Sequence, residues 1–455
     1  MISRFATKDA SQGFGHQSHR FLSAVAARGR SMLRLIKGSG QADPNLRKIS
    51  ELAEDLLSVR GETAGRTIAG ELFDLYRALS VEEKISFLNL IADGYGPDEA
   101  QLRKAVQAYL DKPDGRAIAA LRLATDSPRQ VFIRRLNLAE NGTLDLLRMR
   151  EDALKHQKQI PNFDQIDADF SHVITPWFNI GFLELRQMQW SSSANVLHKI
   201  ISYEAVHEIK GWDDLRRRVE PADRRCYAFF HPRMPDEPLI FVEVALTREI
   251  PASIGSLLDE NRTPIAAENA TTAVFYSISN CQDGLRGIPF GNMLIKRVVE
   301  LLSRQLPLLR TFVTLSPVPR FASWLAKEQE GADSSPYARE LELLEGIGTD
   351  WSPETASAEQ RQALLTMVAH YLVEARTPQG KAINSVARFH LGNGAHLERI
   401  NFAGDLSPYG LKDAHGMMVN YLYDRKKIDT NAQRFAEATV VAASKDVMRL
   451  LQNRK

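Results

Sequence analysis

Cysteine is almost absent from this sequence, which has only Cys226 and Cys281 among its 455 residues. Two thiols cannot build the disulfide scaffold of a small secreted protein, so the count favours a reducing compartment. The sequence also contains no Cys-x-x-Cys pair and no cluster of cysteine and histidine with the spacing of metal ligands. We therefore expect no metal site.

Long apolar runs and an excess of one charge are missing as well. No uninterrupted apolar stretch reaches the roughly 18 residues that a membrane span requires, so we expect no membrane association. The formal net charge is only +2, which gives no electrostatic reason to expect a nucleic-acid partner. The 44% hydrophobic and 25% charged content is typical of globular proteins. The length predicts two or three domains of about 100–200 residues each.

Residues 1–40 differ from the rest because they carry many basic side chains and a single acid, Asp9. Our preferred interpretation is a flexible, solvated tail. The alternative is an organelle transit peptide, because residues 20–37 have the arginine-rich, amphipathic pattern of one. We therefore expect a cytoplasmic protein, or a mitochondrial matrix protein if this segment directs import. The last three residues do not form the peroxisomal Ser-Lys-Leu signal.

Residues 45–158 repeat apolar side chains every three and four positions, as one face of a helix requires. Ser80 and Glu83 have the spacing of a capping box at the start of one such helix. The pattern predicts a helical-bundle domain over residues 41–168 that serves as a scaffold and an oligomerisation surface. One apolar face illustrates the spacing: Leu46, Ile49, Leu52 and Leu56.

After about residue 170 the sequence changes to short runs rich in Val, Ile, Phe and Thr, the residues that favour strands. The segment Asn292–Gln305 has helical spacing and lies between the last two of these runs. Strand, glycine loop, helix and strand in this order predict a βαβ-like unit. Residues 336–379 return to a helical pattern, and residues 417–423 fit a helix or a strand. The predicted strands are residues 225–230, 239–247, 271–279, 310–315 and 396–402.

The loop between the third of these strands and the helix has features of an anion site. Glycines let the backbone approach a ligand, and the N–H groups at a helix start favour a pyrophosphate. The loop is neither a P-loop nor a regular G-x-G-x-x-G motif, so a turn with glycines for packing is the structural alternative. Strand, loop, helix and strand together resemble the acyl-CoA site of the GCN5-related acetyltransferase fold. The loop residues are Arg286, Gly287, Ile288, Pro289, Phe290, Gly291 and Asn292.

Two later segments each carry one reactive side chain. Ser316 ends a strand, and Pro317 after it keeps the serine in extended backbone geometry. His390 precedes a Gly-Asn-Gly turn, and histidine is the common general acid or base near neutral pH. Taken singly, such a serine is more often a turn residue and such a histidine more often a core residue.

Together the loop, serine and histidine segments are far more specific than any one of them. They read FYSISxxQxGLxGxxxGxxLIKRVV over Phe275–Val299, TLSPxPxFxxWL over Thr314–Leu325 and NxVAxFHLxNGAxLxRINxxxDxS over Asn384–Ser407. In order, spacing and wording these motifs resemble the malonyl-CoA decarboxylase family. The resemblance covers residues 170–455 strongly and the helical N-terminal part more loosely.

This resemblance implies an α+β fold class, with an all-helical N-terminal bundle followed by an acetyltransferase-like mixed α/β catalytic domain over residues 169–455. It implies a homo-oligomer, a tetramer or a dimer, that converts malonyl-CoA to acetyl-CoA and CO2 without any cofactor or metal. The family's catalytic serine corresponds to Ser316 and its catalytic histidine to His390. Its acyl-CoA loop corresponds to Arg286–Asn292, where Pro289 departs from the mammalian wording.

Loss of CO2 from malonyl-CoA leaves a thioester enolate, whose oxygen must be stabilised and whose second carbon must be protonated. We expect His390, as an imidazolium, to deliver this proton while Ser316 hydrogen-bonds the departing carboxylate or the enolate. Asp405 and Asn420 could orient the histidine, although a polar surface role is our preferred interpretation for each of them. Two other functions stay open: an acyl-CoA-dependent N-acyltransferase on the same fold, and a non-catalytic acyl-CoA sensor.

Overall fold

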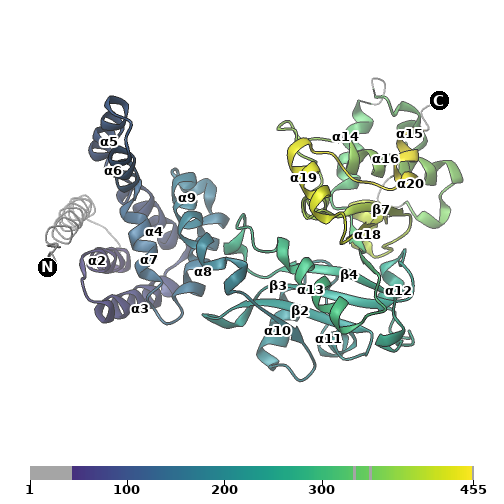
Figure 1. The fold of residues 1–455 in the computed structure, drawn as a ribbon, viewed down its shortest axis with the longest axis horizontal. Helices are drawn as coiled ribbons and strands as arrows, with labels where there is room; N and C mark the ends of the chain where they lie inside the picture. Colours follow the sequence, from purple (N-terminus) through teal and green to yellow (C-terminus); the bar gives the residue numbers. More distant parts are fainter. Residues whose placement is uncertain (1–43, 332–334, 348–350, 453–455) are drawn as a thin grey trace, which may run out of the picture. The chain divides into compact units, whose positions relative to one another are not determined.

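The computed structural model describes residues 44–331, 335–347 and 351–452, so the basic segment 1–40 lies outside the described residues. The chain divides into two compact units (Figure 1). One is helical and runs to Leu183, with the short segments His231–Pro235 and Gln282–Pro289 added to it. The other contains the sheet and the rest of the chain. Among the described residues, no helix is both long and apolar enough to cross a membrane.

The helical unit forms because its helices are amphipathic and begin at good capping residues. The capping box predicted at Ser80 is confirmed, since the serine hydroxyl accepts from Glu83 N at 3.2 Å and the Glu83 carboxylate accepts from Ser80 N at 2.6 Å. Its helices are α2 (Pro44–Ser58), α3 (Glu62–Ala78), α4 (Val81–Gly94), α5 (Glu99–Asp111), α6 (Gly115–Thr125), α7 (Pro128–Leu136), α8 (Gly142–Lys155) and α9 (Phe163–Ile174). Short 3-10 turns lie at Gln157–Gln159, Thr175–Phe178, Ile180–Phe182 and Asp283–Leu285.

The second unit contains a mixed sheet in the order β1-β2-β3-β4-β5-β8-β6, with β7 paired to β8. β4 and β5 form a parallel pair, and α13 (Asn292–Gln305) connects them, which confirms the predicted βαβ-like order. In the segment 417–423, which the pattern left open between helix and strand, residues Met418–Leu422 form a strand. The strands are β1 (Glu184–Met188), β2 (Arg224–His231), β3 (Met234–Thr247), β4 (Thr272–Asn280), β5 (Thr311–Thr314), β6 (Ser316–Pro317), β7 (His396–Asn401) and β8 (Met418–Leu422).

Helices cover the sheet and complete its core. Apolar side chains of β2 and β3 pack with those of α10 and α11, while β4, β5 and β8 pack on α12. The helices are α10 (Ala194–Tyr203), α11 (Trp212–Val219), α12 (Ile254–Leu258), α14 (Phe321–Glu330), α15 (Ala338–Leu343), α16 (Ala358–Val373), α17 (Ser385–Gly392), α18 (Pro408–Ala414), α19 (Ile428–Ala438) and α20 (Lys445–Gln452). The predicted α+β fold, a helical N-terminal region followed by a mixed sheet, is confirmed.

One glycine in the sheet unit is fixed by a close approach. Gly394 has φ +83°, and a Cβ there would lie 1.9 Å from the carbonyl oxygen of Ile428. Gly380 has a similar φ of +76° but open space around its Cβ position. We expect Gly394→Ala to lower the free energy of unfolding by about 2 kcal/mol more than Gly380→Ala, because only the first adds a backbone clash. Urea unfolding of both variants measures this difference, and equal effects would contradict the role of the clash.

Candidate active site

The site starts where two parallel strands separate. β4 pairs with β5 from Thr272 to Phe275, and Leu315 N still donates to Phe275 O at 3.0 Å. Beyond that point Ser316 pairs with Val419 of β8. In the described part of the chain, β4 continues to Asn280 without a strand partner on the edge that faced β5. Tyr276 forms a bulge on β4, because Val244 pairs with Phe275 and Glu243 pairs with Ser277. Strand separation and bulge together leave an opening between β4 and β6.

A cavity of about 280 Å³ occupies this opening. Its walls come from four places that are far apart in the sequence: β3 and β4, β6, the loop after α10, and α17. Most of the lining is apolar, and only a few polar groups converge on it, which is the composition of a small-molecule site. The lining residues are Val206, Ile240, Phe275, Tyr276, Ile278, Asn280, Ser316, Pro317, Ser385, Val386, Phe389 and His390.

Helix α17 brings His390 to this cavity. The Asn384 side chain caps the helix, with Oδ1 accepting from Ala387 N at 2.8 Å. The helix ends at Gly392, so it is only two turns long and holds His390 in its last turn. His390 is buried, with 3% of its surface exposed. Sequence reasoning left this segment unassigned, although an Asn cap followed by Gly392 and Gly394 is a helix signature.

The structure brings Ser316 and His390 into contact. Ser316 Oγ lies 3.2 Å from His390 Nε2 and also donates to Thr314 Oγ1 at 2.8 Å. On the other side of the ring, His390 Nδ1 lies 2.8 Å from the Tyr423 hydroxyl. Tyr421 stacks on the imidazole, with ring centroids 4.6 Å apart. Hydrogen bonds thus connect four side chains into one unit: Thr314, Ser316, His390 and Tyr423.

The direction of these bonds follows from Tyr423. Burial raises the pKa of Tyr423 well above its ordinary value, so the phenol keeps its proton. Among the described residues, the hydrogen-bond partner of this hydroxyl is His390 Nδ1. Nδ1 therefore accepts, and the neutral ring carries its own proton on Nε2, pointing at Ser316. Ser316 Oγ accepts that hydrogen bond and donates its own hydroxyl hydrogen bond to Thr314 Oγ1.

Burial disfavours a charged His390 in the ligand-free protein. Burial lowers the pKa of His390 from its ordinary 6.5 to about 3, because no charged group compensates for the lost solvent. Charging the ring at pH 7 therefore costs about 5 kcal/mol. The polar partners of the ring are the hydroxyls of Ser316 and Tyr423, which are neutral. His390 is therefore a neutral imidazole in the ligand-free protein, whereas the imidazolium was predicted for the step that protonates carbon two.

The two candidate orienting partners are wrong. Asn420 is fully buried, but its amide donates to Thr314 O at 2.8 Å and its oxygen accepts from Arg399 and Asn401. Asp405 accepts from Ser407 N at 2.9 Å, away from the histidine. Asn420 therefore ties β8 to the β5 backbone and does not touch the ring.

Tyr423 is the partner that sequence reasoning missed. Tyr421 and Tyr423 are two residues apart at the end of β8, so their side chains lie on the same face of the strand. This alternation would have predicted two tyrosines beside the site if residues 417–423 had been recognised as a strand. The segment was ambiguous because a short apolar run fits a buried helix equally well.

The predicted acyl-CoA loop is held by a buried arginine. Arg150 of α8 donates to Gly284 O at 2.6 Å, to Arg286 O at 2.9 Å and to the Asp167 carboxylate at 2.7 Å. Gly287 has φ +83°, which a side chain would disfavour. The Arg286 side chain is exposed and lies 3.2 Å from Asp283. This end of the loop therefore has a fixed backbone and a solvent-facing cation.

The other end of the loop reaches the cavity wall. A Cβ at Gly291 would lie 3.1 Å from Ile240 Cδ1, and the Ile240 side chain lines the cavity. Gly291 also begins α13 without any side-chain cap. None of the seven loop residues lines the cavity itself.

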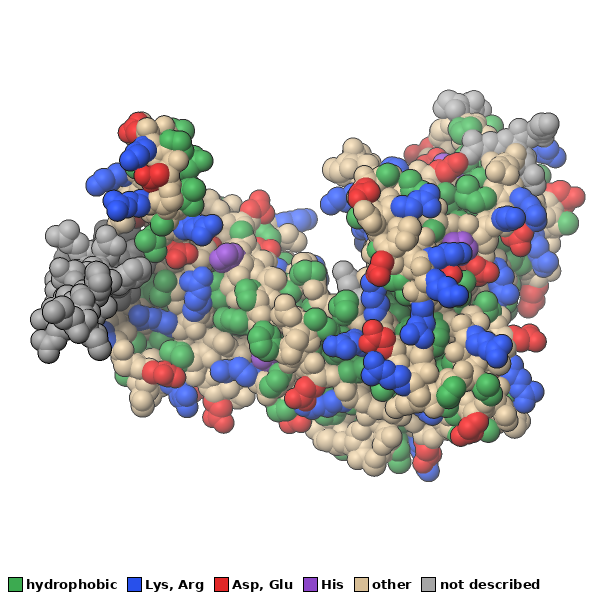
Figure 2. Space-filling view, viewed as in Figure 1, with side chains coloured by type: hydrophobic (Ala, Val, Ile, Leu, Met, Phe, Trp, Pro, Cys, Tyr) green, Lys and Arg blue, Asp and Glu red, His purple; other side chains and the backbone are tan. Residues whose placement is uncertain are grey.

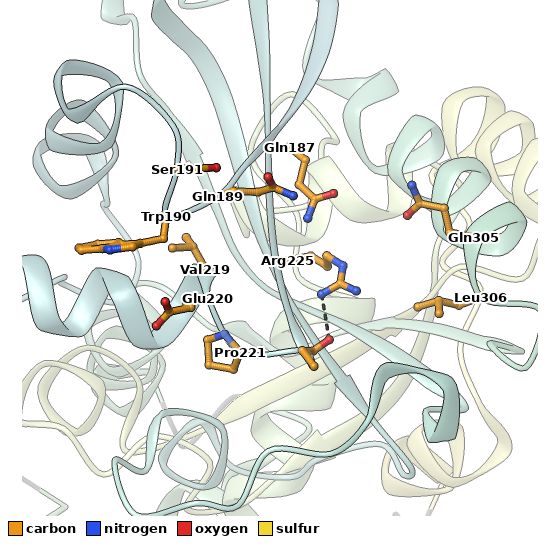
Figure 3. Close-up of a pocket in the computed structure, with 11 residues that line it drawn as sticks. Gln187, Gln189, Trp190, Ser191, Val219, Glu220, Pro221, Arg225, Gln305 and Leu306 are labelled. Atoms are coloured by element: carbon orange, nitrogen blue, oxygen red, sulfur yellow. Dashed lines mark hydrogen bonds between the residues drawn. The ribbon is translucent and has the colours of Figure 1, made fainter.

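A larger cavity of about 760 Å³ lies elsewhere in the sheet unit and is a weaker candidate. Figure 3 shows the side chains of Gln187, Gln189 and Arg225 pointing into it, with Trp190 at its side. Arg225 donates to Ala222 O at 2.9 Å, and Glu220 pairs with Arg216 at 2.6 Å. The lining contains neither a histidine nor a cysteine, so it offers no serine–histidine pair like that of Ser316 and His390. The part of the chain that the structure describes also contains no cluster of metal-binding side chains.

Comparison with known families matches both parts of the chain to one family. The model of the malonyl-CoA decarboxylase C-terminal domain matches residues 181–455, and that of the malonyl-CoA decarboxylase N-terminal domain matches residues 95–178. The chain belongs to the malonyl-CoA decarboxylase family. The matched C-terminal part contains the whole cavity and all four members of the Ser316–His390 unit.

Individual relatives cover most of the chain. The mitochondrial malonyl-CoA decarboxylase of Anser anser anser is 34% identical over 416 residues, which is 84% of this chain and 82% of the relative. That of Rattus norvegicus is 32% identical over 404 residues, covering 81% and 82%. Among solved structures, malonyl-CoA decarboxylase from Rhodopseudomonas palustris has a TM-score of 0.84 with 47% identity, and that from Agrobacterium vitis has 0.83 with 50%. Each alignment covers 89% of this chain and 99% of the solved one.

Proposed function

We propose that this chain converts malonyl-CoA to acetyl-CoA and CO2 at the cavity between β4 and β6. The observation that carries the proposal is the 3.2 Å contact of Ser316 Oγ with His390 Nε2 in an otherwise apolar pocket. Family membership supports the substrate. The malonyl group enters the cavity, and the CoA arm leaves it past Ile240 toward Gly291 and the start of α13.

Decarboxylation needs no electron sink other than the thioester carbonyl. The bond between carbon two and the carboxylate breaks, CO2 leaves without the electron pair, and the pair becomes an enolate. The His390 Nε2–H and the Ser316 hydroxyl are neutral donors that stabilise the developing negative charge in a site with little water. Neutral donors suit this step, because a cation held against the carboxylate would stabilise the ground state and oppose its departure.

The proton for carbon two comes from His390. The enolate carbon of a thioester is a stronger base than an imidazolate, so it can take the Nε2 proton of the neutral His390 ring. The Tyr423 hydroxyl, donating to Nδ1, offsets the charge left on the ring until solvent returns a proton. The unit then regains its starting form when acetyl-CoA leaves.

A neutral imidazole makes a clear pH prediction. Because burial lowers the pKa of His390 to about 3, the ring of the free protein is uncharged at every pH above about 5. We expect kcat/KM for malonyl-CoA to stay level between about pH 7 and 9, where His390 does not titrate. An imidazolium mechanism instead predicts a tenfold fall per pH unit over the same range, and that result would contradict a neutral donor.

An assay without any acyl acceptor tests the activity. Malonyl-CoA is supplied alone in buffer that contains a metal chelator, and acetyl-CoA and CO2 are measured together. We expect both products in equal amounts. If acetyl-CoA or malonyl transfer is seen only after an amine acceptor is added, the chain is an acyltransferase. If the chain binds malonyl-CoA and releases neither product, it is a sensor.

The helical unit supports a homo-oligomer, a dimer or tetramer, as the working form. Helices α5 and α6 form a pair in which Ala105 and Ala117 are the buried residues (Figure 1). Figure 2 shows hydrophobic side chains on the surface of this pair. Leu110 is 68% exposed and Leu123 is 58% exposed. Uncovered apolar surface of this kind marks an interaction site. We expect Leu110→Glu/Leu123→Glu to sediment as a smaller species than the parent protein, and an unchanged sedimentation coefficient would exclude this surface.

The two cysteines support a reducing compartment. Cys226 and Cys281 are free and buried, and burial raises the pKa of both thiols, which suits a reducing interior such as the cytoplasm or the mitochondrial matrix. The division into residues 41–168 and 169–455 stays a prediction.

A further inference from the structure

One side chain joins the two segments that carry the serine and the histidine. Asn384 Oδ1 caps α17 by accepting from Ala387 N at 2.8 Å, and its Nδ2 donates to Pro319 O at 3.1 Å. The side chain is buried, with 2% of its surface exposed. Pro319 lies three residues after Ser316, and Asn384 lies six residues before His390. The same amide therefore contacts the Ser316 segment on one side and the His390 helix on the other.

A second hydrogen-bond donor holds the same Pro319 carbonyl. The Tyr371 hydroxyl of α16 donates to the same Pro319 carbonyl at 2.9 Å. Tyr371 is itself buried and packs on Phe321 and Trp324, with ring centroids 5.7 and 4.8 Å away. The Pro319 carbonyl is thus fixed by two neutral donors from two different helices.

The segment Ser316–Pro319 and helix α17 are both stiff, so a shift of Asn384 also shifts the side chains of Ser316 and His390. Pro317 and Pro319 have restricted φ angles on either side of Val318, which leaves little freedom between the Pro319 carbonyl and Ser316. On the other side, α17 is a continuous helix from Ser385 past His390. A displacement at Asn384 therefore moves the imidazole and the hydroxyl relative to each other.

We infer that Asn384 is a positioning residue, which sets the distance between Ser316 Oγ and His390 Nε2 by holding Pro319 and α17 together. It does not line the cavity, and it acts only through those two side chains. The kinetic test of this inference, which measures turnover of malonyl-CoA, rests on the proposed function. The structural test, which measures the Ser316 Oγ–His390 Nε2 distance, does not. A displacement of about 1 Å between reacting groups can lower a rate by a factor of about a hundred.

The test uses Asn384→Asp in the full-length chain. Aspartate keeps the helix cap and the side-chain shape, but it replaces the donor to Pro319 O with an acceptor. We expect kcat for malonyl-CoA to fall about ten- to a hundredfold, with KM changed by less than about twofold. In the Ser316→Ala background the same change should have almost no further effect, because the distance it controls no longer matters.

Two matched variants complete the design. Tyr371→Phe removes the other donor to Pro319 and should give a smaller fall in kcat. Ser357→Ala removes the hydroxyl of the capping box of α16, so it tests the loss of a helix cap away from the site and should leave kcat unchanged. If Asn384→Asp does not fold, Tyr371→Phe and its combination with Ser316→Ala carry the same comparison.

Three results would overturn the inference: an unchanged kcat, a rise in KM alone, or a full additional loss in the Ser316→Ala background. A parent protein that releases no CO2 from malonyl-CoA would instead refute the proposed function. In that case the crystal structure of Asn384→Asp decides the inference. We expect the Ser316 Oγ–His390 Nε2 contact to be lost in it, and a retained contact would overturn the positioning role.

Discussion

Replacing His390 with asparagine should reduce kcat for malonyl-CoA by about a hundredfold or more, because an amide cannot hand a proton to carbon two. Asparagine fits the space of the imidazole and keeps a donor, so binding of acetyl-CoA should persist. The measurement is initial-rate release of CO2 from malonyl-CoA, beside calorimetric titration with acetyl-CoA.

A second histidine provides the control for this change. His396 on β7 is partly exposed and lies 3.1 Å from the Glu398 carboxylate, outside the cavity. His396→Asn should therefore retain parental turnover. Near-parental turnover of His390→Asn would remove His390 from the proton transfer, whatever the control does.

Replacing Ser316 with alanine should have the other large effect. The change removes one hydroxyl donor to the substrate and leaves the Nε2–H of His390 without its acceptor, at almost constant volume. Loss of one donor to a developing oxyanion costs about a hundred- to a thousandfold in kcat. Steady-state kinetics with malonyl-CoA should show that fall with little change in KM.

The matched control is Ser303→Ala in α13. The Ser303 hydroxyl donates to Val299 O in its own helix at 2.7 Å, so its loss should not change turnover. The double variant Ser316→Ala/His390→Asn should be little slower than the slower single variant, because the two residues act as one unit. Losses that multiply in the double variant would mean that the serine and the histidine act independently.

Local signals in the sequence account for most of the fold. The helix Asn292–Gln305 was predicted with the bounds that the structure has, because a glycine loop precedes it and its apolar spacing is regular. The strand at residues 396–402 was predicted within one residue for the same kind of reason. The segment with His390 was left unassigned, because a two-turn helix has too few residues for its periodicity to be visible.

The site was predicted in part. Ser316 and His390 could be named from their motifs, but the charge of the imidazole could not, since burial and neutral neighbours are properties of the folded chain. The partners of Asp405 and Asn420 could not be predicted, because their hydrogen bonds depend on how the chain folds around β8. Tyr423 was missed because its contact with His390 spans 33 residues and depends on the register of β8.

A crystal structure of His390→Asn soaked with malonyl-CoA tests the central claim most directly, because the slow variant should retain the intact substrate. We predict the malonyl thioester between β4 and β6, with one of its oxygens within hydrogen-bonding distance of Ser316 Oγ and its CoA arm leaving past Ile240. A malonyl group in another place, such as the larger cavity beside Trp190, would contradict the assignment of the active site.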